Sequence, residues 1–283
     1  IHHPLSLMRN SIGMATKTPF SRGVNIFLVA LFGLMLCGVR LSTAAERKIG
    51  VVLMHGKWGS PDRNINELAA SMKSKGFMVS TPVMPWSIHR GYDADYPAAL
   101  EIVDRSVREL RNAGATLVVV AGHSMGANAA VAEAAYGHEP IDGVVAIAPG
   151  HAPEQPGYHQ KIEESLKLAM EMVKAGRGDE PDQFLDINAG RSSTVAMTAA
   201  AYMSYNDPSG MGSMPLSAAK VKQQIPLFWI VAGPGDVLYR QGRGYVFDRW
   251  PSHPKNSYLV IESSHYKAPD DAIGEVVDWL RTL

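Results

Sequence analysis

The stretch Gly122-His-Ser-Met-Gly126 decides how this chain of 283 residues folds, because of the sequence on either side of it. The apolar, β-branched run 116–121 comes just before it and is typical of a buried strand. The small residues 127–135 come just after it and favour a helix. A sharp turn between the two puts Ser124 into a strained backbone conformation, so the residues two positions before and after it must be almost free of side chains. The two glycines of the stretch meet this requirement.

From Lys48 onward the hydrophobic pattern alternates between strands and helices, as a parallel sheet with crossover helices requires. Strands are expected at 49–54, 77–81, 116–121, 143–148, 226–232 and 256–262, and helices at 64–74, 98–111, 127–135 and about 270–281. The sequence therefore predicts an α/β fold with a mostly parallel central sheet.

The interval from Pro149 to Pro226 breaks this alternation. It contains no strand that the pattern identifies, and helices are expected at 160–175 and near 193–204. An insertion after the strand at 143–148 lies over the carboxyl edge of such a sheet, where ligands bind. We therefore predict a helical cap or lid at about 150–225, with a longer crossover packed beside the sheet as the alternative.

A serine held on such a turn is a candidate nucleophile, and the arrangement requires an oxyanion loop upstream, then an acid and a histidine downstream. The segment His55-Gly-Lys-Trp-Gly59 directly follows the first predicted strand. Acyl transfer develops negative charge on oxygen, and two preorganised backbone N–H groups stabilise that charge. We expect these to be the N–H groups of Lys57 and Met125, with Gly56 letting the backbone turn close to the site. A plain turn at a strand end is the alternative, and the Lys57 side chain is expected to be solvated.

The downstream acid and histidine are also found at predicted strand ends. Gly233-Pro-Gly-Asp236 follows the strand at 226–232, and a carboxylate there can accept the Nδ1–H of a catalytic histidine. Asp207 and Asp248 are weaker candidates, because neither directly follows a predicted strand. Of the ten histidines, only His265 lies between the last predicted strand and the terminal helix.

Two tryptophans and two further histidines were also considered. Trp58 and Trp86 are in loops that follow predicted strands, where they could contact a substrate or belong to the core. His55 is expected to be a structural hydrogen-bonding residue. His123 is expected to point away from Ser124, because adjacent side chains diverge.

The chain order Ser124, Asp236, His265, together with the glycines of the elbow (Gly122, Gly126) and the His-Gly loop, resembles the α/β-hydrolase superfamily, in its serine esterase and lipase-like branch. The resemblance covers about residue 48 to the C-terminus but does not extend through the insertion. It implies the α/β-hydrolase fold and a catalytic domain at 46–283.

The resemblance also implies a reaction cycle. His265 takes the proton of Ser124, which attacks an acyl carbonyl, and a water activated by the same histidine hydrolyses the acyl-enzyme. No cofactor is required. We expect a carboxylic ester hydrolase that acts on a small-molecule or lipid-like acyl ester. An acyltransferase, thioesterase or amidase could use the same triad, and an inactive binding protein on a hydrolase fold is the alternative from another class.

The composition argues against a nucleic-acid-binding protein, a metalloprotein and a cysteine hydrolase. Lys plus Arg and Asp plus Glu each number 27, and no basic run is present, so nucleic acid is not expected as a partner. No sequence motif for a metal site is found, so no metal is expected. The single cysteine, Cys37, lies near the N-terminus, which excludes a cysteine nucleophile in the predicted catalytic domain.

The N-terminal extension, residues 1–45, resembles a secretory signal peptide. Lys17 and Arg22 precede the apolar stretch 26–39, and small residues follow it up to Ala45. We expect export to the periplasm or the exterior after cleavage beside Ala44 or Ala45. The alternative is a membrane-anchored protein held through residues 26–39, which would be its only contact with a membrane.

Overall fold

The computed structural model describes residues 47–283. The predicted signal segment and Cys37 lie outside the described residues. Within the described part of the chain, no helix combines the length and the apolar character needed to cross a membrane.

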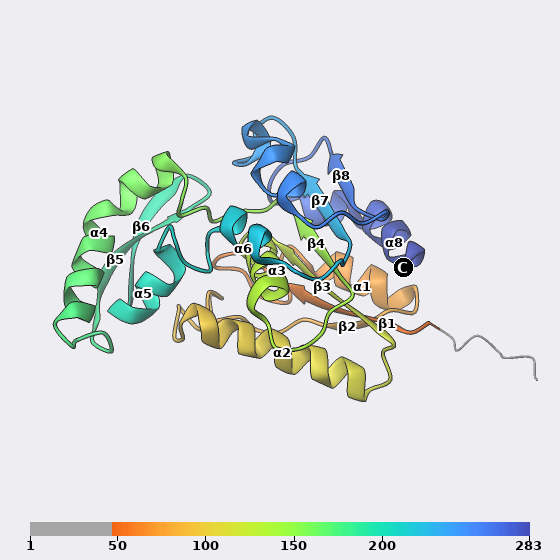
Figure 1. The fold of residues 1–283 in the computed structure, drawn as a ribbon, viewed down its shortest axis with the longest axis horizontal. Coiled ribbons are helices and arrows are strands. Elements are labelled where there is room, and N and C mark those ends of the chain that lie inside the picture. Colours follow the sequence, from red (N-terminus) through yellow and green to blue (C-terminus); the bar gives the residue numbers. More distant parts are fainter. Residues whose placement is uncertain (1–46) are drawn as a thin grey trace, which may run out of the picture. The chain divides into compact units, whose positions relative to one another are not determined.

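A six-stranded parallel sheet forms the centre of residues 47–283, in the order β2-β1-β3-β4-β7-β8 (Figure 1). The strands are β1 (Ile49–Met54), β2 (Met78–Ser80), β3 (Leu117–His123), β4 (Gly143–Ile147), β7 (Leu227–Val231) and β8 (Ser257–Val260). Every one of the six predicted strands is present. The inner strands β1, β4 and β7 are buried along their whole length, as expected for a parallel sheet covered on both faces.

Helices cover both faces of the sheet. Alternate side chains of each strand point to opposite faces, so that Val52 and Val120 pack with α2 and α3, whereas Val51 and Val119 pack with α1 and α8. The bounds are α1 (Asn66–Ser74), α2 (Tyr96–Asn112), α3 (Met125–Tyr136), α6 (Met214–Lys220), α7 (Ala268–Asp271) and α8 (Ile273–Thr282). The predicted terminal helix is thus divided into α7 and α8. Three single-turn helices lie between β7 and β8, namely η1 (Tyr239–Gln241), η2 (Arg243–Tyr245) and η3 (Phe247–Arg249).

The insertion, residues 150–225, corrects one prediction. Besides α4 (Pro156–Lys174) and α5 (Ala199–Asn206), it contains an antiparallel hairpin of β5 (Pro181–Asn188) and β6 (Arg191–Thr198). The expectation of no strand there was wrong, and so was the start of the second helix near residue 193. Most of the buried side chains of the hairpin lie on one face, where the ring of Phe184 stacks on that of Tyr202 at 4.5 Å. In Figure 1 these four elements form a lobe beside the sheet.

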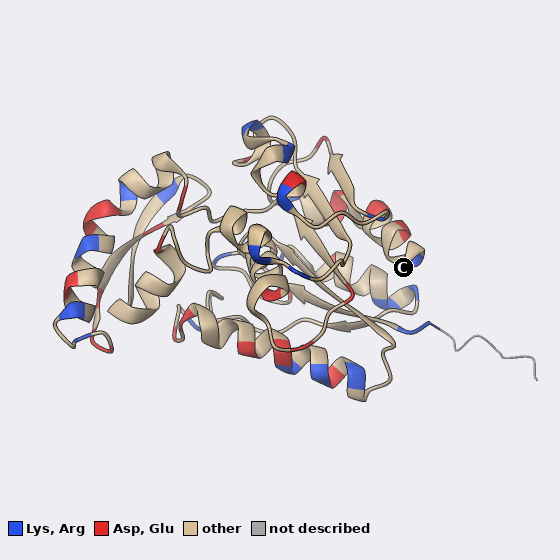
Figure 2. Cartoon of the chain, viewed as in Figure 1, with Lys and Arg blue, Asp and Glu red and all other residues tan. Residues whose placement is uncertain are grey.

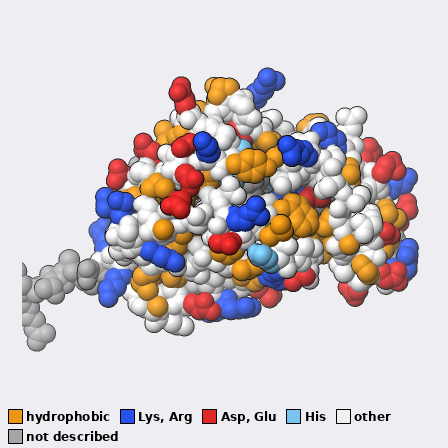
Figure 3. Space-filling model, turned by 180° about the vertical axis from the view of Figure 1, so that it is seen from behind, with side chains coloured by type: hydrophobic (Ala, Val, Ile, Leu, Met, Phe, Trp, Pro, Cys, Tyr) orange, Lys and Arg blue, Asp and Glu red, His pale blue; other side chains and the backbone are white. Residues whose placement is uncertain are grey.

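Residues of both charges are distributed along α2 and α4 (Figure 2). In the view from behind, hydrophobic side chains form small groups separated by charged and polar ones (Figure 3). The face drawn in Figure 3 therefore has no broad area of one chemical kind.

Candidate active site

Ser124 lies on the turn between β3 and α3 in a strained conformation, with φ 55° and ψ −114°. A Cβ on Gly122 would lie 2.1 Å from the carbonyl carbon of Gly126. A Cβ on Gly126 would lie 2.4 Å from the carbonyl oxygen of Met54. Both distances are far below any van der Waals contact, so the two glycines are needed for the steric reason expected from the sequence.

The three residues in the predicted order lie next to one another. The Oγ of Ser124 is 3.0 Å from Nε2 of His265, and Nδ1 of His265 is 2.9 Å from Oδ1 of Asp236. Asp236 is on the loop after β7, and His265 is on the loop after β8. The carboxyl ends of β3, β7 and β8 meet at one edge of the parallel sheet, which is how residues 141 positions apart come within hydrogen-bonding distance.

Asp236 is held as a carboxylate. Its Oδ1 also accepts the N–H of Val237 at 2.7 Å, and its Oδ2 accepts the N–H of Ala232 at 3.1 Å. Burial acts to raise the pKa of Asp236, but the hydrogen bond and charge of His265 and the two backbone donors outweigh it, so that the pKa is lowered. An ionised Asp236 fixes the His265 tautomer that carries its proton on Nδ1 and leaves Nε2 free to accept from Ser124.

The loop after β1 contacts the serine from one side. A Cβ on Gly56 would lie 3.0 Å from the Cβ of Ser124, so the backbone of Gly56 approaches Ser124 more closely than a residue with a side chain could without a shift. Among residues 47–283, neither the N–H of Lys57 nor that of Met125 has a hydrogen-bond acceptor. Two unused backbone donors in the loops that adjoin Ser124 are what an oxyanion site requires.

A narrow polar pocket opens onto Ser124. Its volume is about 20 Å³, room for one or two waters. The described residues that line it include no Val, Leu, Ile, Met, Phe, Asp or Glu; they are Gly56, Lys57, Gly59, Arg63, Asn64, His123, Ser124, Asn188, His265 and Tyr266. Arg63 has no carboxylate within 4 Å in the described part of the chain, so the free charge of this pocket is positive.

A larger pocket, of about 300 Å³, lies on the other side of the β5–β6 turn. Its lining is mixed and includes Ala152, Tyr158, Lys161, Val237 and Gln241. Ile187 at the end of β5 and residues 189 and 190 of the turn line this pocket, whereas Asn188 lines the pocket at Ser124. The turn therefore separates the two. Among the residues of the described chain, no three His, Cys, Asp or Glu side chains are grouped in a way that would hold a metal ion.

The two neighbouring histidines are structural. His55 is buried, its Nδ1 lies 2.9 Å from the Gly56 carbonyl oxygen, and its Nε2 accepts the N–H of Met84. Burial lowers the pKa of His123 to about 3, with the charge of His265 acting in the same direction. His123 is therefore neutral and donates its Nε2–H to the carbonyl of His265 at 2.8 Å, which holds the loop after β8.

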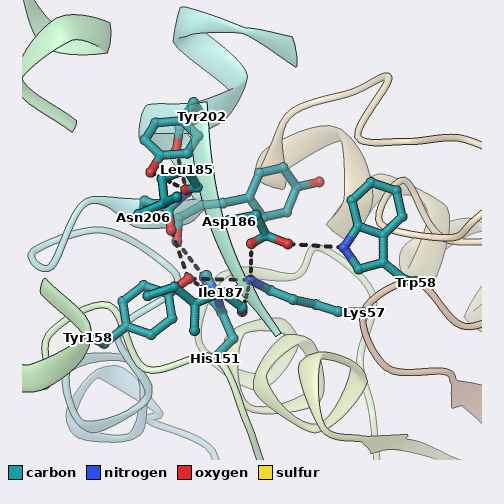
Figure 4. A network of polar contacts seen from close by, with 10 residues as sticks. Lys57, Trp58, His151, Tyr158, Leu185, Asp186, Ile187, Tyr202 and Asn206 are labelled. Atoms are coloured by element: carbon teal, nitrogen blue, oxygen red, sulfur yellow. Dashed lines mark hydrogen bonds and ion pairs between the residues drawn. The ribbon is translucent and has the colours of Figure 1, made fainter. Parts of the chain in front are cut away.

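The structure corrects the position expected for the Lys57 side chain. It is not solvated: its Nζ lies 2.5 Å from Oδ1 of Asp186, and the side chains of Lys57 and Asp186 are only 4% and 5% exposed (Figure 4). Trp58 donates its indole N–H to Oδ2 of the same carboxylate at 3.0 Å. Trp86 is fully buried and donates to the carbonyl of His55, so of the two roles left open by the sequence it has the core role.

Gly150, which the sequence did not single out, contacts the serine from the other side. A Cβ there would lie 2.7 Å from Oγ of Ser124, and the Gly150 N–H donates to the Ser124 carbonyl at 3.1 Å. The signal that could have found it is its place directly after β4, the strand next to β3 in the sheet.

Comparisons with known proteins agree with this architecture. A model of the "Alpha/beta hydrolase family" matches residues 51–279. Three similar solved structures are a monoacylglycerol lipase of Paleococcus ferrophilus (18% identity, TM-score 0.57, covering 82% of this chain and 94% of that one), a soluble variant of monoglyceride lipase from Saccharomyces cerevisiae (13%, 0.60, 83% and 87%) and the thioesterase domain of the curacin biosynthetic pathway (13%, 0.51, 83% and 92%). No curated protein sequence matches. At these identities the solved structures establish a shared fold.

Proposed function

Because the chain belongs to the alpha/beta hydrolase family, we propose that it is a serine hydrolase that cleaves carboxylic esters through an acyl-enzyme on Ser124. The observation that carries the proposal is the continuous hydrogen-bonded series from Ser124 through His265 to Asp236. The domain at 46–283 would then be the catalytic domain.

Each of the three side chains has a distinct role in the proposed cycle. His265 takes the Ser124 proton on Nε2 as Oγ attacks the acyl carbonyl, and Asp236 stabilises the imidazolium that forms. The same proton then passes from Nε2 to the leaving alcohol. A water that enters next gives its proton to His265 and attacks the acyl-enzyme, which releases the acid and restores Ser124.

The backbone donors act on the charge that develops in both halves of the cycle. The N–H groups of Lys57 and Met125 would bind the oxyanion, where the loss of one donor typically costs about 100-fold to 1000-fold in kcat. Both donors are already unpaired, so no hydrogen bond within the described chain must break before they act.

The pocket at Ser124 favours a short, polar acyl group over a long aliphatic chain. A hydrocarbon chain gains from burial against apolar side chains, and the described lining provides none of the large aliphatic ones. Because Arg63 supplies an unpaired positive charge, we expect neutral and anionic esters to be better substrates than cationic ones.

The test compares Ser124→Ala with the wild-type enzyme on p-nitrophenyl esters of increasing acyl length, beside thioester and amide substrates. We expect turnover of acetate and butyrate esters to exceed that of the octanoate, and Ser124→Ala to abolish both turnover and labelling by a fluorophosphonate probe. Undiminished ester hydrolysis by a folded Ser124→Ala variant would refute the assignment. Faster thioester or amide turnover would redirect it to those alternatives, and a wild-type protein that neither turns over nor labels would be a binding protein.

We also propose that the protein is exported after removal of residues 1–45, on the evidence of the charged, apolar and small-residue segments in its sequence. Mass spectrometry of the mature N-terminus tests this. A chain that starts beside residue 45 supports export with cleavage, whereas an intact segment 26–39 in a membrane fraction supports the anchored alternative.

A further inference from the structure

Two glycine backbones enclose Ser124, and each leads directly into one buried polar network. Gly56 approaches the Cβ of Ser124, and Gly150 approaches its Oγ. The next residue after each glycine is Lys57 in the first loop and His151 in the second. The side chains of Lys57 and His151 therefore connect the two loops that adjoin the nucleophile.

The connection runs through the insertion (Figure 4). The ammonium group of Lys57 binds Oδ1 of Asp186 at 2.5 Å, donates to the carbonyl of Ile187 at 3.1 Å, and lies 3.3 Å from the hydroxyl of Tyr158. The Tyr158 hydroxyl is in turn 3.1 Å from Nδ1 of His151. Thus β5 supplies the carboxylate and α4 supplies the hydroxyl that joins the two loops.

The network is fixed at its other end by the core. The Nε2 of His151 lies 2.7 Å from the Tyr205 carbonyl oxygen. The side-chain amide of Asn128, on α3, donates to the carbonyls of His151 and Gly212 at 2.7 Å each. Because α3 begins directly after Ser124, the helix that holds one end of the network is the helix that follows the nucleophile.

The charges in the network fix the protonation states of its two basic groups. Burial lowers the pKa of His151 to about 3, with the charge of Lys57 acting in the same direction, so the ring is neutral. Burial also acts to lower the pKa of Lys57, but Asp186 outweighs it and the pKa is raised, so the amine is charged. The neutral ring donates Nε2–H to the Tyr205 carbonyl and leaves Nδ1 as an acceptor. The single proton of the Tyr158 hydroxyl faces two acceptors at 3.1 Å, Nδ1 of His151 and Oδ1 of Asn206. Each donor named here has an acceptor, which is the condition for a buried network to be rigid.

We propose that Lys57 and Asp186 are positioning residues: their buried ion pair, extended through Tyr158 to His151, sets the separation of the two loops around Ser124 and holds the Lys57 N–H where the oxyanion forms. The insertion is then a working part of the active site. This inference rests on the proposed function for its kinetic readout. The side chains act through the backbone, so we expect their removal to lower kcat by misplacing a donor and to change KM little.

The decisive variant is the double substitution Lys57→Met with Asp186→Asn. It removes both charges at once, so no unpaired charge is left buried. Asparagine keeps the volume of Asp186 and retains an oxygen that can accept the indole N–H of Trp58. The matched control is Arg177→Gln with Glu180→Gln, which removes an exposed ion pair of 3.1 Å in the same insertion. Circular dichroism and cooperative urea unfolding establish that both double variants fold.

We expect kcat on a p-nitrophenyl acetate substrate to fall about 10-fold to 100-fold in the first double variant, with KM changed by less than about threefold, and neither to change in the control. Restoring a cation with Lys57→Arg beside the native Asp186 should recover part of kcat. If the ion pair matters only for stability, the first double variant will have a lower urea midpoint but an unchanged kcat in its folded form. That result would overturn the proposal.

Two further measurements keep the inference testable if the double variant does not fold or if the chain cleaves no ester. Tyr158→Phe removes only the hydroxyl between Lys57 and His151, and we expect a fall in kcat of about threefold to tenfold at constant KM. Hydrogen exchange of peptides covering 56–59 and 150–152 needs no turnover, and it should become at least tenfold faster in the Tyr158→Phe variant. Unchanged exchange in both loops refutes the positioning role. Absent wild-type ester turnover with accelerated exchange refutes the proposed function and leaves the positioning role standing.

Discussion

Adding one methyl group at Gly150 should displace the nucleophile while leaving the fold intact. The new Cβ would lie 2.7 Å from Oγ of Ser124, whereas ordinary contact begins at 3.4 Å, so the two must separate by about 0.7 Å. Gly150 does not have a positive φ, so alanine fits its backbone. The serine hydroxyl is the atom free to move, because it can rotate about one bond.

The cost follows from the hydrogen bond that this rotation breaks. Oγ and Nε2 of His265 are 3.0 Å apart, and a shift of about 0.7 Å or a change of rotamer puts Oγ beyond the reach of the base. Misplacement of a reacting group by about 1 Å typically costs about 100-fold, so we expect kcat of Gly150→Ala to fall by roughly 100-fold. The free energy of unfolding should change by less than about 1 kcal/mol, because no backbone group has to move.

The assay is steady-state hydrolysis of p-nitrophenyl acetate together with the rate of fluorophosphonate labelling, both of which require an aligned Ser124. Gly274→Ala is the matched control, because a Cβ on Gly274 meets nothing within 4 Å. If the Gly150→Ala variant hydrolyses the ester and reacts with the probe as fast as the control, then the arrangement of Ser124 and His265 described above is not the one used in the reaction.

Three other substitutions test separate parts of the structure. Gly126→Ala places a Cβ 2.4 Å from the backbone oxygen of Met54 and should lower the free energy of unfolding by about 1–3 kcal/mol or more in urea titrations; a neutral result would contradict the packing of the elbow. Asp236→Asn should reduce kcat about 10⁴-fold, and a loss below tenfold would remove Asp236 from the triad. Burial and the charge of Asp104 raise the pKa of Glu133 to about 10 from its usual 4.5, so this group favours the folded state fully below pH 4.5 and progressively less as the pH rises toward 10. Glu133→Gln should therefore add about 3 kcal/mol of stability at pH 7 and flatten the pH dependence of urea unfolding between pH 5 and 9; an unchanged pH profile would show that the carboxyl is not held protonated.

The parts of the site that the sequence could predict are those fixed by local chain geometry. Ser124 could be placed because strand, turn and helix follow one another within a few residues. Asp236 and His265 could be placed because each directly follows a strand, and the carboxyl ends of parallel strands share one edge. The order of the strands and the distances between the three side chains had to come from the structure.

The hairpin β5–β6 escaped prediction for reasons visible in its sequence. β5 begins with a proline and has two aspartates, which disfavour strands, and β6 runs without a break into the alanines of α5, so that the two together resemble one helix. The position of Lys57 escaped for a different reason, because its partner Asp186 is 129 positions away. Once β5 is known to be a strand, Asp186 falls on its buried face beside Phe184, and a buried carboxylate requires a partner of opposite charge.

The double hydrogen bond of Asn128 has a consequence for how this protein could diversify. One side chain of the core holds the chain where it leaves the sheet at His151 and again where it returns at Gly212. A segment whose two ends are held together can be replaced with little strain on the rest, which is the condition under which insertions are exchanged between proteins. A replacement segment would have to bring its own partners for the buried Lys57 ammonium, which here are Asp186, Ile187 and Tyr158 of the insertion.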